Sequence, residues 1–156
     1  RCEFPSSDRG KGNGWSYKYA RRQWNLVDNK ELCYHYLGDF DRKMLEVIKS
    51  QKNFNKTPVQ EIWHNDGDQV LAFMRGDLVF VFNFSPTRSF TDYGFLVPTG
   101  SYDVVLNTDA VEFGGNGLAD DSMTHLTNYD SLYVEDKKEW LKLYLPARSA
   151  VVLRKN

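Results

Sequence analysis

The stretch QVLAFMR (69–75), GD (76–77), LVFVFNF (78–84) decides the fold class of this chain. Two runs rich in β-branched and aromatic residues flank a two-residue loop that begins with glycine. This pattern is typical of a β-hairpin closed by a type II′ turn. We therefore expect antiparallel strands at the centre of the fold.

The second of these strands carries an apolar residue at nearly every position. Phe80, Phe82 and Phe84 recur at period two and are interleaved with Val79 and Val81. Because both sets are apolar, we expect both faces of this strand to be buried in the core.

Further strands are expected on both sides of the hairpin. The run 59–64 reaches the hairpin through NDGD (65–68), and the run 101–107 follows the turn PTG (98–100). Residues 139–145 place Leu141, Leu143 and Leu145 on one face, and residues 150–153 form a last strand. Six to eight antiparallel strands without helices between them predict a mainly β fold, an antiparallel β-sandwich of the Greek-key type.

A different pattern precedes the strands. Residues 1–16 are rich in Gly, Ser, Asp and Asn and indicate a loop. Asp28 and Glu31 have the spacing of a capping box, and an amphipathic helix is expected after them, with a possible interruption at Gly38. Its apolar positions are Leu37, Phe40, Met44 and Ile48. The polar residues 53–58 mark a boundary between the two parts.

Composition narrows the possible partners. The chain has 156 residues, 41% of them hydrophobic, with 20 basic and 21 acidic residues and a formal charge of −1. No block of like charge predicts binding to nucleic acid or to an anionic membrane. No apolar run approaches the roughly 20 residues that span a bilayer, and the start lacks the apolar core of a signal peptide. We therefore expect a cytoplasmic protein with a neutral partner.

Motifs for catalysis or for a bound cofactor are not found in the sequence. His35, His64 and His125 show no metal-binding spacing, and the two cysteines have no Cys or His companions. GGNG (114–117) lacks the Lys-Ser/Thr of a phosphate-binding loop and predicts a tight turn. Asp120-Asp121 predicts solvated loop charge. We expect no catalytic residue, metal or cofactor in this chain.

Three groups of segments nevertheless form a specific pattern. They are GNGWSYKYARRQW (12–24) with the helical stretch after it, RGDLVFVFNFSP (75–86) followed by SFTDY (89–93) and NTDAVEFGG (107–115), and YLPARS (144–149). In order and spacing the pattern resembles the C-terminal region of 1,4-α-glucan (glycogen or starch) branching enzymes. These enzymes are members of the α-amylase superfamily, glycoside hydrolase family 13.

The resemblance implies an architecture and a reaction. Residues 1–55 would be the last loop and helix of a catalytic (β/α)₈ barrel, and residues 56–156 the α-amylase C-terminal all-β domain. The parent enzyme would cleave α-1,4 links and transfer the cut chain to a 6-hydroxyl. The family draws its catalytic carboxylates from barrel strands upstream of Arg1, so this fragment is expected to be inactive. Its partners would be an α-glucan and the remainder of the barrel.

Candidate glucan contacts follow from the chemistry of sugar binding, in which aromatic faces stack on sugar rings. The candidates are Trp15, Tyr17, Arg21, Arg22, Trp63 and Trp140. Trp63 is expected to share a face with Val59 and Glu61, and Trp140 a face with Lys142 and Tyr144. The alternative is a scaffold without sugar affinity, in which the residues of 17–24 hold the barrel against the sandwich. A secreted adhesin or free-standing carbohydrate-binding module is disfavoured by the missing signal sequence.

Overall fold

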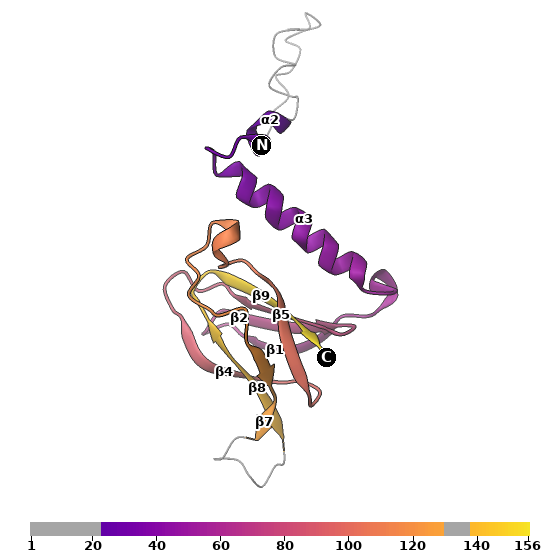
Figure 1. The fold of residues 1–156 in the computed structure, drawn as a ribbon. Helices are drawn as coiled ribbons and strands as arrows, with labels where there is room; N and C mark the ends of the chain where they lie inside the picture. The colour runs from indigo at the N-terminus through magenta and orange to yellow at the C-terminus, as the bar shows by residue number, and fades with distance from the viewer. Residues whose placement is uncertain (1–22, 130–137) are drawn as a thin grey trace, which may run out of the picture. The chain divides into compact units, whose positions relative to one another are not determined.

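The computed structural model describes residues 23–129 and 138–156 of the chain. The chain divides into two compact units, Arg1–Gly38 and Asp39–Asn156. Figure 1 shows the order of the elements along the chain. The expected border between residues 1–55 and 56–156 refers to the domains of a longer enzyme, and it stays a prediction.

The first unit contains α2 (Trp24–Asp28) and the beginning of α3 (Tyr34–Ser50). The predicted capping box is wrong, because Asp28 ends α2 instead of starting the next helix. The side chain of Asn29 forms the turn here, and its Oδ1 accepts the Glu31 N–H at 3.0 Å. The possible interruption at Gly38 is also wrong. A Cβ at Gly38 would lie 2.6 Å from Cγ1 of Val27, so glycine gives α2 room to approach an unbroken α3.

In the second unit, the remainder of α3 covers one outer face of the sandwich. Val47 is 6% exposed and lies in an apolar cluster with Leu78, Leu106 and Val152. The partly buried members of this cluster are Phe40, Met44, Phe54, Phe80, Val105 and Phe113. The amphipathic helix is confirmed, and its last turns supply the layer that shields this part of the sheet from water.

Nine described strands form two sheets in which the paired strands run antiparallel, as expected from the sequence. The larger sheet has the order β1 (Gln60–Asn65), β2 (Val70–Arg75), β3 (Leu78–Asn83), β9 (Ser149–Lys155), β5 (Ser101–Asn107), β6 (Thr124–Leu126). The smaller sheet has the order β4 (Phe90–Leu96), β8 (Glu139–Leu145), β7 (Asn128–Tyr129). Of two short 3₁₀ helices, η2 (Phe54–Lys56) lies between α3 and β1, and η3 (Val111–Phe113) lies between β5 and β6. The predicted antiparallel fold is confirmed (Figure 1).

The apolar core lies between the two sheets. Leu141, Leu143 and Leu145 alternate inward along β8, as expected from the sequence. The buried residues of this core are Val70, Ala72, Val79, Val81, Phe95, Tyr102, Leu141, Leu143, Leu145, Val151 and Leu153. Both strands of the central hairpin, and strand β8, thus turn alternate residues toward this core, as strands of packed sheets do.

The hairpin of β2 and β3 is confirmed, but the burial predicted for its phenylalanines is wrong in part. Gly76 has φ of +64° while Asp77 does not have a positive φ, which is the pattern of a type II′ turn. Val79 and Val81 face the core, whereas Phe80 and Phe82 point to the outer face and are only partly buried. Phe84 follows the strand and is 60% exposed.

Candidate functional site

The outer face of the central hairpin carries a stack of four aromatic rings. Phe73 lies 4.8 Å from Phe80 and 5.9 Å from Phe82 between ring centroids, with interplanar angles of 16° and 20°. Phe82 in turn lies 5.6 Å from Phe84 at 6°. We call these four residues the phenylalanine stack. Phe80 also belongs to the cluster under α3, so the stack extends the apolar surface that the helix covers.

Trp63 lies at the border of the two sheets and connects them. A register shift between Glu61 and Trp63 places Trp63 opposite Ala72, which faces the core, and Glu61 opposite Phe73. The expectation that Trp63 and Glu61 share a face is therefore wrong, because a bulge reverses the alternation. The ring is 39% exposed.

The polar edge of Trp63 has a partner on the smaller sheet. Nε1 of Trp63 donates to the hydroxyl of Tyr93 at 3.1 Å, and that hydroxyl donates to Oδ2 of Asp68 at 3.0 Å. Arg88 contacts the other oxygen of Asp68 at 3.0 Å. Burial is the main cause that raises the pKa of Tyr93. These contacts join β1, β4 and two loops, and the role of Trp63 as a glucan contact stays a prediction.

Trp140 lies on the outer face of the smaller sheet, because along β8 it alternates with the leucines that face the core. A Cβ added to Gly94 of β4 would lie 3.3 Å from Cε3 and 3.8 Å from Cδ2 of Trp140. The indole therefore lies across the surface of the neighbouring strand, at a position where glycine leaves room for it. Tyr144 is on the same face, as expected, and is 37% exposed.

A pocket opens beside Tyr144, between the sheets and the segment that follows η3. Its polar lining residues are Asp120, Asp121, His125 and Tyr144. The apolar lining residues are Val104, Leu118, Ala119, Met123, Leu143 and Val151. Since β7 pairs only with residues 139 and 140 of β8, the edge of β8 at Tyr144 is left open to this pocket.

The carboxylates of this region hold the backbone of the loop. Both oxygens of Asp109 accept N–H groups, from Asn116 at 3.0 Å and from Leu118 at 2.7 Å. Asp121 accepts a hydrogen bond from the buried amide of Asn107 at 2.7 Å. Asp120 accepts from Ser122, and these bonds lower the pKa of the Asp120 carboxyl. Of the residues 114–117, for which a tight turn was predicted, Gly114 lies in a turn, and Asn116 and Gly117 donate to Asp109.

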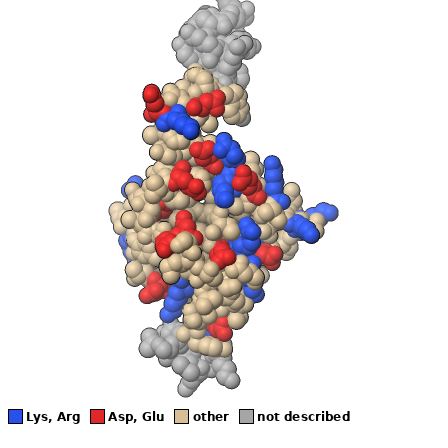
Figure 2. Space-filling view, viewed as in Figure 1, with Lys and Arg blue, Asp and Glu red and all other residues tan. Residues whose placement is uncertain are grey.

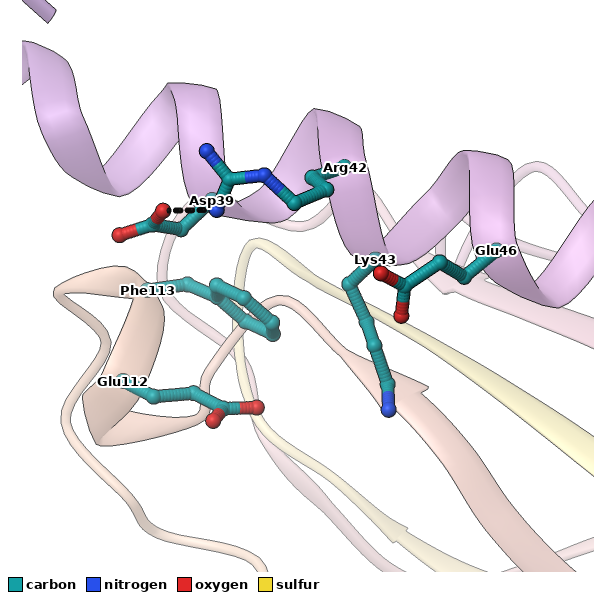
Figure 3. Close-up of a pocket in the computed structure, with 6 residues that line it drawn as sticks. All are labelled: Asp39, Arg42, Lys43, Glu46, Glu112 and Phe113. Carbon is teal, nitrogen blue, oxygen red and sulfur yellow. Dashed lines mark hydrogen bonds and ion pairs between the residues drawn. The ribbon is translucent and has the colours of Figure 1, made fainter.

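A second, polar pocket lies between α3 and η3 in the second unit (Figure 3). It is lined by Asp39, Arg42, Lys43, Glu46, Glu112 and Phe113. Nη1 of Arg42 binds Oδ1 of Asp39 at 2.6 Å. The ring of Phe113 packs against Phe40 at 5.3 Å with an interplanar angle of 87°. The Phe113 ring thus packs against α3. The pocket lies at the polar border of the apolar cluster that contains Val47.

The three histidines lie on different elements, α3, β1 and β6. His64 Nδ1 lies 2.7 Å from Oε1 of Glu61, and this hydrogen bond raises the pKa of His64. Burial lowers the pKa of His125 against the opposing effect of Asp103, Asp120 and Asp121. Within residues 23–129 and 138–156, no group of three His, Cys, Asp or Glu side chains could hold a metal ion.

In the described part of the chain, no helix has the length and apolarity needed to cross a membrane. Basic and acidic side chains are interspersed over the face of the molecule drawn in Figure 2.

Four of the predicted glucan contacts, Trp15, Tyr17, Arg21 and Arg22, lie outside the described residues, and their role stays a prediction.

Two antiparallel sheets around one apolar core, with a helix on an outer face, define an all-β sandwich domain. The family model described as "Alpha amylase, C-terminal all-beta domain" matches residues 62–156. The chain belongs to this family.

Longer proteins are similar to nearly the whole chain. It is 42% identical to the 1,4-alpha-glucan-branching enzyme of Saccharomyces cerevisiae over 152 residues, which are 97% of this chain and 21% of that protein. The corresponding enzyme of Eremothecium gossypii is 40% identical over 99% of this chain and 21% of its own length. A chloroplastic/amyloplastic 1,4-alpha-glucan-branching enzyme of Oryza sativa is 42% identical over 78% of this chain and 15% of its length. The chain thus spans about a fifth of the length of the first two relatives.

Proposed function

We propose that this chain is the C-terminal part of a 1,4-α-glucan branching enzyme. Such an enzyme cleaves α-1,4 links and transfers the cut chain to a 6-hydroxyl, which makes α-1,6 branches in glycogen or starch. The observation that carries the proposal is the identity of about 40% to branching enzymes over nearly all residues of the chain. We place the reaction in the cytoplasm, and cell fractionation would check that location.

The contribution of the chain itself is structural support. The phenylalanine stack continues the apolar surface that α3 covers, and the exposed ring of Phe84 ends it. An exposed apolar surface next to a packed one is typical of an interface. Since the relatives are about five times as long as this chain, the remainder of the parent polypeptide is the partner that we assign to the stack.

A comparison of two contexts tests this role. In the isolated chain, Phe84→Ser should change the free energy of unfolding by less than about 0.5 kcal/mol, because the ring is already exposed. In the full-length parent, the same substitution should lower the thermal midpoint by at least about 2 °C, because it removes a buried contact. Differential scanning calorimetry measures both.

Leu126→Ser is the matched control, because Leu126 is 59% exposed on β6 and does not belong to the stack. It should leave both midpoints unchanged. Equal effects of Phe84→Ser and Leu126→Ser in the parent would contradict the assigned interface. The branching reaction is tested separately, by the loss of iodine staining when amylose is incubated with the full-length parent.

A further inference from the structure

The loop that follows η3 contains the pair Asn116-Gly117. In an Asn-Gly pair the backbone nitrogen of glycine can attack the side-chain amide of asparagine, because glycine has no side chain to obstruct the approach. Here the Gly117 nitrogen would lose its proton to water and form a bond to Cγ of Asn116. The bond from Cγ to Nδ2 then breaks, and ammonia leaves. Water opens the resulting succinimide ring at either carbonyl, and the product is aspartate or isoaspartate.

The attacking nitrogen is held in a hydrogen bond. The Gly117 N–H donates to the backbone oxygen of Asp109 at 2.7 Å. Both neighbouring residues donate to the carboxylate of the same aspartate, Asn116 N–H to Oδ1 at 3.0 Å and Leu118 N–H to Oδ2 at 2.7 Å. Three successive N–H groups thus bind one residue, and we call these three hydrogen bonds the Asp109 clamp.

The acceptor of the clamp is buried, whereas the reactive pair is exposed. Asp109 is 8% exposed, and its own N–H is fixed by Oδ1 of Asn107 at 2.9 Å. Asn116 and Gly117 are exposed, so water reaches the side-chain amide. A Gly117 nitrogen bound to Asp109 is free neither to lose its proton nor to turn toward Cγ of Asn116. The reaction therefore requires that the clamp opens first.

We propose that Asn116 is a deamidation site whose rate is controlled by the Asp109 clamp. The reaction proceeds in the fraction of molecules in which the clamp is open, so its rate is that of an unstructured peptide multiplied by this fraction. The isoaspartate product does not close the clamp again. Its main chain is longer by a methylene group, which moves the Gly117 and Leu118 N–H groups out of register with the Asp109 oxygens.

The 156-residue chain itself serves for the test, with mass spectrometry of proteolytic peptides after prolonged incubation at mildly alkaline pH. Peptide mapping separates Asn116 from the second Asn-Gly pair, Asn13-Gly14. A synthetic peptide of residues 110–121 gives the rate without the clamp. Asn116 should deamidate at least about tenfold more slowly in the chain than in the peptide, because hydrogen bonds to a carboxylate must break first. Hydrogen exchange of the Gly117 N–H should be slowed by the same factor, because it needs the same opening.

Asp109→Asn tests the clamp directly. An amide side chain has one acceptor oxygen where a carboxylate has two, so one N–H group of the loop loses its partner. Asn116 should then deamidate about tenfold faster than in the wild-type chain.

Val70→Ala is the matched control. Val70 is 2% exposed in the core, on β2, which β3 and β9 separate from the strand that precedes Asp109. The substitution lowers the stability of the whole chain but leaves the clamp in place. It should therefore leave the deamidation rate of Asn116 unchanged.

Three results would overturn the inference. These are equal rates at Asn116 in the chain and in the peptide, equal rates in Asp109→Asn and the wild type, and equal acceleration by Val70→Ala and Asp109→Asn. The last would assign the reaction to unfolding of the whole chain. If Asp109→Asn fails to fold by circular dichroism, the wild-type rate relative to the peptide and the exchange of the Gly117 N–H decide. None of these measurements depends on branching activity, so failure of the proposed function leaves the inference standing.

Discussion

Gly115 occupies a position at which no other residue fits. A Cβ there would lie 2.2 Å from both the carbonyl carbon and the carbonyl oxygen of Asp109. These are backbone atoms that side-chain rotation cannot move. The close approach allows the loop to wrap around the Asp109 carboxylate, which binds the N–H groups of Asn116 and Leu118.

We therefore predict that Gly115→Ala lowers the free energy of unfolding by more than about 3 kcal/mol, because the backbone must shift to relieve the clash. Urea denaturation followed by circular dichroism measures the change. Gly67→Ala is the control, since its Cβ would meet only a side-chain oxygen of Asn65 at 3.3 Å. It should change stability by less than about 1 kcal/mol. A similar effect of both substitutions would show that the approach to Asp109 is not the cause.

His125 makes the stability of the chain depend on pH. Burial lowers its pKa in the folded state below the ordinary value of 6.5. At a pH below that value the unfolded chain binds the proton more readily than the folded chain does, so acid favours unfolding. This stability is present above pH 6.5 and is lost as the pH falls through the lowered pKa.

We predict that the wild-type chain loses more stability than His125→Gln when the pH falls from about 7.5 to about 5.5. Urea titrations at each pH measure the slopes. His64 has the opposite effect, because Glu61 raises its pKa, but it is present in both proteins and cancels in the comparison. Equal slopes in the two proteins would refute the assignment to His125.

At the scale of elements, the packing of α3 on the larger sheet depends on one face of the helix. Val47 is buried against Leu78 and Val152, whereas Leu45 of the same helix is 49% exposed. The contrast separates a packing contribution from the helix propensity of the residue.

Val47→Ala is predicted to lower the free energy of unfolding by about 2 kcal/mol, through lost apolar burial and the cavity left behind. Leu45→Ala should cost less than about 1 kcal/mol, although it removes a larger side chain. Thermal denaturation of the isolated chain, with the fraction folded followed by circular dichroism, measures both. A greater loss from Leu45→Ala would mean that α3 packs through its other face.

At the scale of the whole molecule, the branching reaction proposed for the parent calls for a larger architecture than two antiparallel sheets. A retaining transfer needs a carboxylate nucleophile and a carboxylic acid about 5 Å apart on either side of the scissile bond. The family barrel that carries such a pair needs roughly 250 residues. The described strands of this chain instead pair in two antiparallel sheets.

We expect no branching by the isolated chain, at any concentration that the assay allows. The measurement is the iodine absorbance of amylose after incubation, with the full-length parent as the positive control. A fall in absorbance that persists with pure chain would refute the prediction.

Local patterns in the sequence determined much of the fold. The Gly76-Asp77 turn and the alternation of Leu141, Leu143 and Leu145 predicted their strands correctly. These features depend on the residues within one strand or turn, so no distant partner was needed to recognise them. The predicted start of α3 was wrong. The spacing of Asp28 and Glu31 suggested a helix cap, but Asn29 forms a turn there by accepting the Glu31 N–H.

Only the tertiary structure decided which face of a strand meets the core and what each aromatic does. Period two does not distinguish the two faces of β3, and α3 covers Phe80 but leaves Phe84 exposed. The bulge that turns Trp63 toward Tyr93 and the glycine beneath Trp140 depend on pairing with distant strands. The sequence by itself therefore determined an antiparallel sandwich after a helix. Contacts between residues far apart in the chain made Trp63 a link between the sheets and placed Trp140 beside Gly94, because strand register and layer packing are long-range properties.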